Sequence, residues 1–327
     1  MIPKVSVIIP IYNVEKHFRK CVISLFEQSL NNIEFIFVDD CTPDGSINIL
    51  ESCLQAYHHL KPQVTILKHD RNRGLAAGRN TGLRIAKGEY IFHCDSDDWL
   101  DKNALEKMYT LASTHDLDLV WSDFFLAFTN KNRYMSQSCV PDKMTYLKVL
   151  LSGGLKYNVW NKLVKRSIFE DNNIYFPEGN NMGEDMTMIK VAASTERIGY
   201  LSEGLYYYLQ NNSSAYTKNY SNDSLDQLKH NVGEVTNFLK NYYGELLNKE
   251  INFFKLNVKV PFLISSKIEV YKIWIEWYPE SNEYIDLNEY FSYRIKILQK
   301  IALHQQFWLL RIYHFFFTKL IYGYIYK

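Results

Sequence analysis

The stretch that decides the fold reads Gly88-Glu89-Tyr90-Ile91-Phe92-His93-Cys94-Asp95-Ser96-Asp97-Asp98-Trp99. Residues 89–94 predict a strand that is covered on both faces, because apolar side chains follow one another there. Three carboxylates come directly after it, and they repel one another unless solvent or a cation compensates. Oxygen ligands suit Mg²⁺ or Mn²⁺, which bind through one or two carboxylates and bridge substrate phosphates. From spacing alone, a metal site and an Asp-rich turn that leads into a helix at Trp99 explain the stretch equally well.

Strand and helix signals alternate through the first 125 residues. Strands are predicted over 5–10, 33–38, 64–67, 89–94 and 117–123, and helices between them, including 74–86 and 102–114. Asn13 is expected to cap the first helix, and Thr42-Pro43 to begin the second. The pattern predicts an α/β fold with an open, mainly parallel sheet that carries helices on both faces.

Polar residues gather just after the predicted strands, at Tyr12-Asn13, Asp39-Asp40 and 95–98. In open α/β sheets, ligands bind at the carboxyl ends of the strands, so we expect the site there. Asp39-Asp40 alone is explained as well by turn chemistry. Residues 72–80 open a helix with small residues, and a helix N-terminus favours phosphate. The sequence has no GxGxxG after the first strand and no GxxxxGK[ST], which counts against dinucleotide and P-loop sites.

Length and composition limit the classes that remain. The chain has 327 residues, enough for one large or two modest domains, and 47% of them are hydrophobic, which excludes a disordered chain. Lys+Arg number 37 and Asp+Glu 36, so no global field would attract nucleic acid. The five cysteines form no CxxC pair, which argues against a disulfide framework or zinc knuckle and for a reducing cytoplasm. No stretch reaches the roughly 18–20 apolar residues of a membrane span.

The chain has a different character from about residue 140 on. Residues 140–215 are irregular and rich in Gly and Asn, and residues from about 222 on are helical and aromatic. After Glu289 there is no acidic residue, whereas basic and aromatic residues alternate to the end. This composition is typical of a helix on a membrane surface. A helical bundle that packs on the main domain, or on a partner subunit in a homo-oligomer, explains it equally well.

The motifs, in their order along the chain, resemble those of the family 2 glycosyltransferases. The matching segments are 5–13, Val38-Asp39-Asp40, 74–82 and 88–99, which together cover about residues 4–125. Trp160-Asn161-Lys162 is similar to the W-x-K element of the family, and Gly183-Glu184-Asp185 to its G-E-D element. The resemblance implies a GT-A fold, a nucleotide-sugar donor, a divalent metal and inversion at the anomeric centre.

The resemblance also implies a role for each matching residue. Pro10 and Tyr12 would line the nucleobase pocket, and Asp40 would accept a hydrogen bond from the imide of the base, which favours uracil. Asp95 would contact the ribose or the sugar, and Asp97 together with Asp95 would ligate Mn²⁺ or Mg²⁺. The other expected nucleotide-sugar contacts are Asn13, Arg79, Asn80, Ser96, Trp160 and Lys162.

Asp185 would be the general base that deprotonates the acceptor hydroxyl, with Glu184 beside it. Inverting transfer needs a carboxylate opposite the leaving group, which fits this assignment. Taken alone, the pair is explained more simply as an acidic helix start that favours the dipole. One departure concerns residues 206–214, which lack the basic residues that many relatives carry there. Ser213, Ser214 and Lys218 are the candidates to replace them.

The sequence therefore predicts a GT-A domain over 1–220, with a donor half (1–125) and an acceptor and base half (126–220), followed by a helical region (221–327). The expected function is that of a cytoplasmic, metal-dependent hexosyltransferase, peripheral on the inner membrane face, that moves a sugar from a UDP-sugar to a glycan hydroxyl. The expected acceptor is a lipid-linked oligosaccharide of a bacterial surface polysaccharide. The alternative is a non-catalytic nucleotide-sugar or glycan-binding scaffold, although such proteins usually lose the acidic site residues. A sugar-nucleotide synthesising enzyme would carry a Gly-rich, basic loop in place of 10–13.

Overall fold

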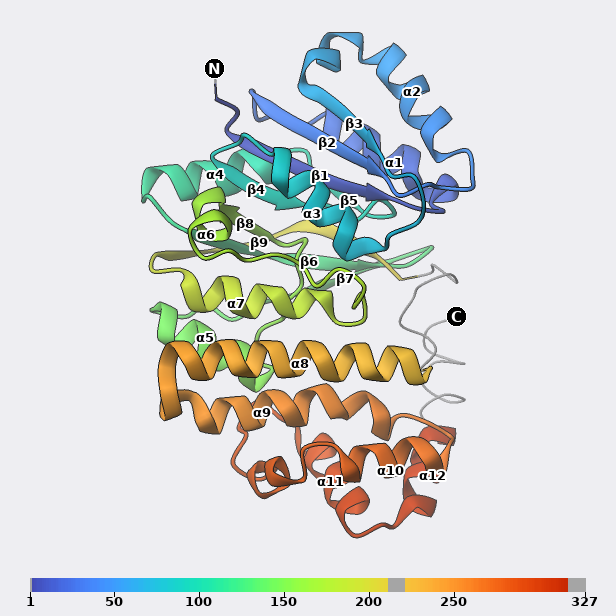
Figure 1. Ribbon diagram of the computed structural model, residues 1–327, viewed down its shortest axis with the longest axis vertical. Coiled ribbons are helices and arrows are strands. Elements are labelled where there is room, and N and C mark those ends of the chain that lie inside the picture. Colours follow the sequence, from blue (N-terminus) through green and yellow to red (C-terminus); the bar gives the residue numbers. More distant parts are fainter. Residues whose placement is uncertain (1, 211–220, 317–327) are drawn as a thin grey trace. The chain divides into compact units, whose positions relative to one another are not determined.

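The computed structural model describes residues 2–210 and 221–316 (Figure 1). Contacts divide them into two compact units. The first takes the residues up to Met144 together with Tyr157–Val235, and the second takes Thr145–Lys156 together with the residues from Thr236 on. The expected boundary lay after residue 220. In the structure the first unit extends to Val235, within the helix Asn222–Tyr243, and residues 145–156 belong to the second unit.

The first unit is built on a mixed, nine-stranded sheet in the order β3-β2-β1-β4-β8-β6-β9-β5, with β7 paired to β6. Strands β1 to β4 are parallel to one another, as predicted, whereas β8 runs antiparallel to both β4 and β6. The strands are β1 Val5–Ile11, β2 Ile33–Asp39, β3 Val64–Lys68, β4 Tyr90–His93, β5 Trp99–Leu100, β6 Leu119–Ala127, β7 Asn132–Met135, β8 Lys162–Lys165 and β9 Ile198–Leu209.

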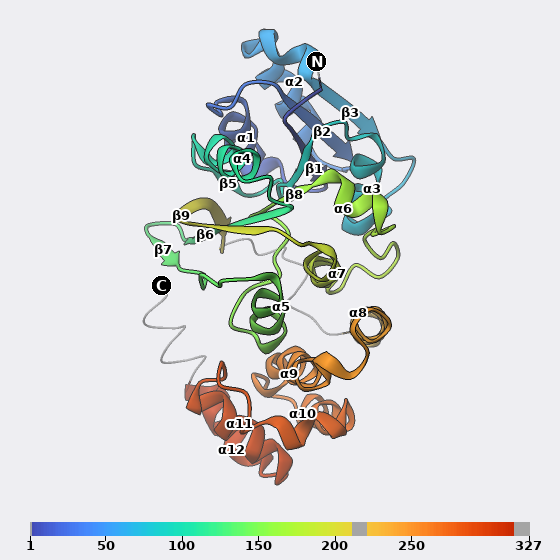
Figure 2. The same cartoon turned by 90° about the vertical axis from the view of Figure 1, so that its left-hand side faces the viewer.

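Helices cover both faces of this sheet, and Figure 2 shows α1 and α4 on one face with α3 and α6 on the other. Every residue of β1 is buried, because alternate side chains enter the core on each face. The helices of this unit are α1 Glu15–Phe26, α2 Ser46–Ala56, α3 Leu75–Ile85, α4 Ala104–Thr114, α6 Arg166–Asp171 and α7 Thr187–Ser194, and the 3₁₀ turns are η1 His58–Gln63 and η2 Glu184–Met186.

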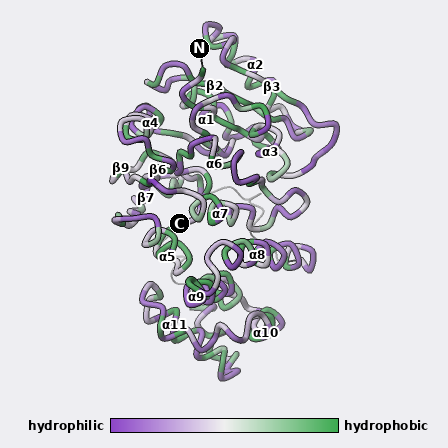
Figure 3. Tube along the Cα trace, turned by 60° about the vertical axis from the view of Figure 1, so that its left-hand side comes forward, coloured by the Kyte–Doolittle hydropathy of each residue, from purple (hydrophilic) through white to green (hydrophobic). Residues whose placement is uncertain are grey.

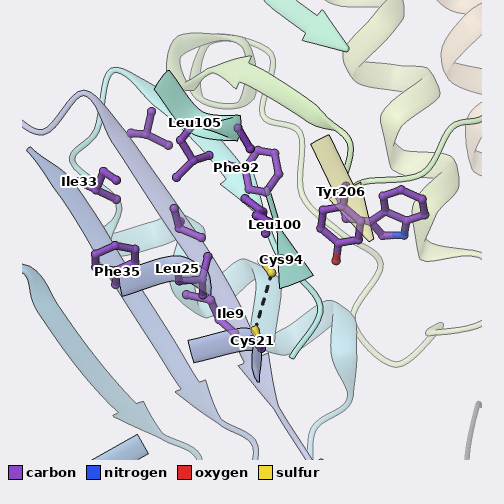
Figure 4. Packing of buried hydrophobic residues seen from close by; sticks show 14 of the residues in the cluster. Ile9, Cys21, Leu25, Ile33, Phe35, Phe92, Cys94, Leu100, Leu105 and Tyr206 are labelled. Atoms are coloured by element: carbon purple, nitrogen blue, oxygen red, sulfur yellow. Dashed lines mark hydrogen bonds between the residues drawn. The ribbon is translucent and has the colours of Figure 1, made fainter. Parts of the chain in front are cut away.

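The core between β1, α1 and α4 is apolar and contains two free thiols. Figure 4 shows Ile9, Leu25 and Phe92 packed there, with the Cys21 and Cys94 sulfur atoms 3.9 Å apart. All five cysteines are free, in line with the expectation that they form no disulfide framework. The buried thiols of Cys21 and Cys94 therefore pack as small hydrophobic groups.

Both predicted helix caps were wrong. Asn13 adopts a positive φ of 54°, and α1 has no side-chain cap from its own N-terminal residues. Instead, Asp44 Oδ2 accepts a hydrogen bond from the Glu15 N–H at 2.8 Å. Thr42-Pro43 does not begin α2 either, because α2 starts at Ser46 and the Thr42 hydroxyl donates to Asp44 Oδ1. Asp44, in the β2–α2 loop, thus accepts hydrogen bonds both from the start of α1 and from Thr42 in its own loop.

The second unit is helical, as expected, and has an aromatic core around Phe254, Phe262 and Trp274. Lys259 is buried in it, where Nζ donates to the Asn282 side chain at 2.7 Å and to the Trp277 carbonyl at 2.8 Å. Helix α8, which crosses from the first unit into the second, alternates hydrophobic and hydrophilic residues in Figure 3. The helices are α5 Lys143–Ser152, α8 Asn222–Tyr243, α9 Asn248–Lys259, α10 Ile268–Glu276, α11 Tyr293–Leu303 and α12 Phe307–Phe316, and the 3₁₀ turns are η4 Gly244–Leu247, η5 Val260–Leu263 and η6 Pro279–Tyr284. None of the described helices combines the length and the apolar character needed to cross a bilayer.

Candidate active site

A single buried guanidinium joins two of the predicted site elements. Arg79 projects from α3 and is 1% exposed. Its Nη2 lies 2.9 Å from Asp95 Oδ1, just after β4, and 3.7 Å from Glu184 Oε1 in η2. Asp95 and Glu184 are far apart in sequence, so the fold brings the predicted donor loop and the predicted catalytic loop together. Arg79 Nε and Nη1 find no hydrogen-bond partner among the described residues.

The two acids of the Gly183-Glu184-Asp185 element are largely buried, and burial dominates their titration. Burial, with a smaller contribution from Asp185, raises the pKa of Glu184 to about 8. Burial raises the pKa of Asp185 to about 6, although the positive charge of Arg79 opposes the shift. Asp185 Oδ1 is buried without a hydrogen-bond partner among the described residues. A carboxylate with a raised pKa and an unused oxygen can accept a proton.

Arg79 keeps its charge in this place. Burial alone would lower its pKa, but the carboxylates of Asp95, Glu184 and Asp185 reverse the effect and raise the pKa further. Lys162, at the start of β8, is the second cation that acts on Asp185, and burial lowers the pKa of its ammonium to about 7. Lys162 Nζ donates to the Asn158 carbonyl at 2.7 Å and to Asn161 Oδ1 at 2.9 Å. Three acids and two cations thus form one electrostatic cluster.

The loop after β4 holds its carboxylates in different ways. Asp98 is fully buried, and its oxygens accept hydrogen bonds from the Tyr206 hydroxyl and the Leu209 N–H, both at 2.7 Å. Burial and then the charges of Asp97 and Asp95 raise the pKa of Asp98 well above its usual range. Asp98 therefore anchors the loop to β9, whereas Asp95 and Asp97 are partly exposed.

The donor set of this loop fits a divalent cation. Among residues 2–210 and 221–316, no three Asp, Glu, His or Cys side chains converge into a ready-made metal cage. Mg²⁺, however, is usually held by one or two carboxylates and completes its shell with water and substrate phosphates. Asp95 and Asp97, both partly exposed, supply such a pair.

The nucleobase side of the predicted site is only partly open. Tyr12 is 46% exposed at the end of β1, next to the exposed Asn13, so its ring is available for stacking. Pro10 is buried in β1 under Gly78 of α3, where an added Cβ would lie 3.1 Å from the proline Cβ. The small residues of α3 are thus needed for close packing on the strand.

Asp40 is engaged within the protein. Its Oδ1 accepts a hydrogen bond from the Arg73 N–H at 2.8 Å and its Oδ2 from the Gly74 N–H at 2.7 Å. His69 Nδ1 lies 2.6 Å from Asp40 Oδ1, and its Nε2 lies 2.9 Å from Thr81 Oγ1. In this arrangement Asp40 fixes the turn before α3, and its contact with a base stays a prediction. His69 is buried.

Three other predicted contacts are engaged or buried within the protein, and their contact with a donor stays a prediction. Asn80 holds the loop before η2, because it exchanges hydrogen bonds with the Phe176 backbone at 2.8 and 2.9 Å and donates to Glu178 at 3.0 Å. Trp160 is buried with its ring stacked on Tyr206 at 4.5 Å between centroids. Ser96 is buried between the two partly exposed aspartates.

Sequence reasoning missed the residues that hold the catalytic loop. Glu178 pairs with Arg73 and Arg84 at 2.9 and 2.8 Å, and Asn181 Oδ1 accepts from the Ala76 N–H at 3.1 Å. Tyr206 was also missed, although its hydroxyl contacts both Asp98 and the Asp95 N–H. In the sequence, the only signal for Glu178 was an acidic residue within a loop, and the only signal for Tyr206 was the aromatic run 206–208. Ser213, Ser214 and Lys218 lie outside the described residues.

Comparison with known proteins fits this geometry. Residues 6–180 match the model of the family "Glycosyl transferase family 2". The chain is 29% identical to "Uncharacterized glycosyltransferase EpsJ" of Bacillus subtilis over 276 residues, 81% of this chain and 78% of that protein. It is also 27% identical to "Poly(ribitol-phosphate) beta-N-acetylglucosaminyltransferase TarS" of Staphylococcus aureus, over 83% of this chain and 48% of that protein.

Solved structures show the same fold. A crystal structure of S. aureus TarS in complex with UDP superposes with a TM-score of 0.67 and 20% identity, covering 96% of this chain and 91% of that chain. Mannosyltransferase PcManGT from Pyrobaculum calidifontis, in complex with GDP-Man and Mn²⁺, gives a TM-score of 0.50 at 16% identity, over 94% of this chain and 87% of that chain. The family match covers more than half of the chain and contains the β1, β2 and β4 ends described above. The chain belongs to glycosyl transferase family 2 and is a glycosyltransferase with the GT-A fold.

Proposed function

We propose that this enzyme moves one sugar from a UDP-sugar to a hydroxyl group of a glycan acceptor, with inversion at the anomeric carbon. The observation that carries the proposal is the Arg79 bridge, which keeps the Asp95 loop next to the loop that bears Asp185. A donor held by the first loop would present its sugar to a base on the second. The unused, buried oxygen of Asp185 is the atom proposed to receive the proton.

In the proposed reaction, the acceptor oxygen attacks the face of the anomeric carbon opposite the diphosphate. Its O–H proton passes to Asp185 as the new C–O bond forms and the bond to the diphosphate breaks. The charge of Arg79 beside the base, with a smaller contribution from Lys162 when its ammonium is protonated, favours the ionised form of Asp185 despite burial. Retention of configuration in the product, measured by NMR of the anomeric proton, would contradict this mechanism.

Asp95 and Asp97 would hold Mn²⁺ or Mg²⁺. When bound, the cation would neutralise the charge that develops on the departing diphosphate. Support comes from the pair of partly exposed carboxylates and from the distant relative PcManGT, which was solved with GDP-Man and Mn²⁺. Uracil is the proposed base because TarS, the more similar of the two folds, was solved with UDP and with UDP-GlcNAc.

Calorimetric titration of UDP and of GDP, with and without Mn²⁺, tests the donor assignment. We expect UDP to bind only with metal, and the Asp97→Ala variant to lose this binding. GDP binding in place of UDP would keep the reaction class and overturn the uridine assignment. Failure of both nucleotides to bind to folded protein would instead favour a non-catalytic scaffold.

The acceptor is proposed to be a membrane-linked glycan of a surface polysaccharide, so that the enzyme would work as a peripheral protein on the cytoplasmic face. Support comes from exposed aromatic residues on α11 and α12, where Tyr293 is 81% and Trp308 60% exposed. Arg294 and Arg311 lie on the same two helices, and cations beside aromatic residues suit an anionic lipid surface.

Co-sedimentation with vesicles of phosphatidylglycerol and phosphatidylcholine tests this part. The double variant Tyr293→Ser/Trp308→Ser should lose most vesicle binding. The matched variant Tyr242→Ser, which removes an exposed aromatic ring on α8, should keep it. Equal binding by all three proteins would argue for a partner subunit or a second copy at this surface.

A further inference from the structure

A groove of about 560 Å³ extends along α1 beside β5, and we call it the α1 groove. Its lining includes Lys16 and Lys20 of α1, Trp99 and Leu100 of β5, and Lys102 just beyond β5. Asp97 also lies in the lining, so the groove reaches the loop proposed to hold the metal. A second hollow of about 490 Å³ shares Lys20 and Trp99 with the first and continues it toward Lys131.

The α1 groove is basic in a protein that is close to neutral overall. The formal net charge of the chain is +1, yet cations cluster in these two hollows at Lys16, Arg19, Lys20, Lys102 and Lys131. The acids in their lining are Asp97 and Glu27, and Glu27 accepts a hydrogen bond from the Tyr57 hydroxyl at 2.6 Å. Among the described residues, neither Lys16 nor Lys102 forms an ion pair. Such a cluster attracts an anion.

Aromatic rings also line the two hollows, Trp99 in both and Tyr207 in the second. Trp99 is stacked on Tyr207 with centroids 5.3 Å apart, and Tyr207 is stacked on Phe125 at 4.8 Å. Lys20 Nζ lies 3.0 Å from the centre of the Trp99 ring. All three rings are partly exposed. Partly exposed rings beside cations suit a ligand that has apolar C–H faces as well as negative charge.

We infer that the α1 groove binds an anionic segment of the glycan acceptor, in which sugar or polyol units carry phosphate or carboxylate groups. The inference rests on the proposed function and names the acceptor class for it. The lysines would pair with the charges, and the parts of Trp99 and Tyr207 that remain exposed would contact the C–H groups of the units. Because Asp97 lines the groove, a chain bound there would lie next to the donor loop. Binding along the groove would therefore deliver one end of the chain to the transfer site.

Two anionic probes test this inference on the full chain: a synthetic glycerol-phosphate oligomer of about eight units and an octamer of galacturonic acid. The methyl-esterified octamer is the neutral control. We expect at least one anionic probe to bind in metal-free buffer, and the neutral octamer not to bind. The double variant Lys16→Gln/Lys102→Gln should weaken binding about five- to twentyfold, as expected for two exposed charge pairs. Comparison of the two anionic probes identifies the charged group.

The control variant Lys61→Gln/Lys87→Gln removes two exposed lysines outside the groove and should leave probe affinity unchanged. Equal losses in the two double variants, or no binding of either anionic probe, would overturn the inference. Loss of UDP affinity in Lys16→Gln/Lys102→Gln would also overturn it, because these lysines would then serve the donor diphosphate. If the wild-type protein binds the anionic probe through the groove but binds no nucleotide, the groove stands and the proposed function fails.

Discussion

Arg79 Nη2 lies 2.9 Å from Asp95 Oδ1, and it is the contact that ties α3 to the end of β4. The same nitrogen lies 3.7 Å from Glu184 Oε1. Removing one partner of a buried ion pair leaves an uncompensated charge, which typically costs about 3–5 kcal/mol. We therefore expect Arg79→Met to lower the free energy of unfolding by about that amount and to abolish metal-dependent UDP binding, as measured by urea titration and calorimetry.

Arg84→Met is the matched control for this prediction. Arg84 lies on the same helix, is half exposed and pairs with Glu178 at 2.8 Å. Exposed pairs contribute about 0–1 kcal/mol, so this variant should remain near the stability of the wild-type protein. If the two variants were equally stable, the Arg79 bridge would not organise the site.

The proposed base predicts a pH dependence. Burial raises the pKa of Asp185 to about 6, so the ionised form that accepts a proton is lost as the pH falls through this value. We expect kcat/KM to fall about tenfold per pH unit below pH 6. Asp185→Asn should lower turnover at least about 100-fold at pH 7.5 while UDP affinity stays within about twofold. Normal turnover by this variant, or a profile that is flat from pH 5 to 7, would assign the base elsewhere.

Glu184 predicts a pH dependence of stability with a definite sign. Its pKa is raised from 4.5 to about 8 by burial and by Asp185, so between these values the folded state holds a proton that the unfolded state has lost. The free energy of unfolding must then fall as the pH rises through this window. Glu184→Gln removes this titration. The free energy of unfolding of the variant, relative to that of the wild-type protein, should therefore rise from pH 5 to pH 8, by at most about 1.4 kcal/mol per pH unit. Urea titrations at both pH values measure the difference, and a constant gap would contradict it.

The sequence predicted the frame of the site because its signals are local. Buried strands read as apolar runs, and β1, β2, β3 and β4 all begin and end within a residue or two of the prediction. The polar residues that follow them do lie at the carboxyl ends of a parallel set. Helix caps were less predictable, because the oxygen that caps α1 comes from Asp44, in another loop. The sequence alone does not show which loop supplies the oxygen that accepts from an N–H group at the start of a helix.

The sequence could not tell which polar residues face the site and which face the protein. Asn80 follows Arg79 directly, yet it binds the backbone at Phe176, which lies 96 residues further on. Side chains that follow one another on a helix point in directions about 100° apart, so one motif supplies both a site residue and a structural one. The two-residue strand β5 was likewise missed, because its pairing with β9 depends on a partner more than 100 residues away.

Two glycine substitutions test how closely α3 packs on the sheet. A Cβ at Gly82 would lie 2.4 Å from Ile8 Cγ2, and Ile8 is fully buried in β1. Overpacking of this kind costs about 1–3 kcal/mol, against roughly 1 kcal/mol gained from the better helix propensity of alanine. A Cβ at Gly233 in α8 would meet no described atom within 4 Å. Gly82→Ala should therefore lower the free energy of unfolding, while Gly233→Ala raises it by about 0.5–1 kcal/mol. Urea titration of both variants provides the measurement, and shifts of the same sign would show that α3 can move away from β1.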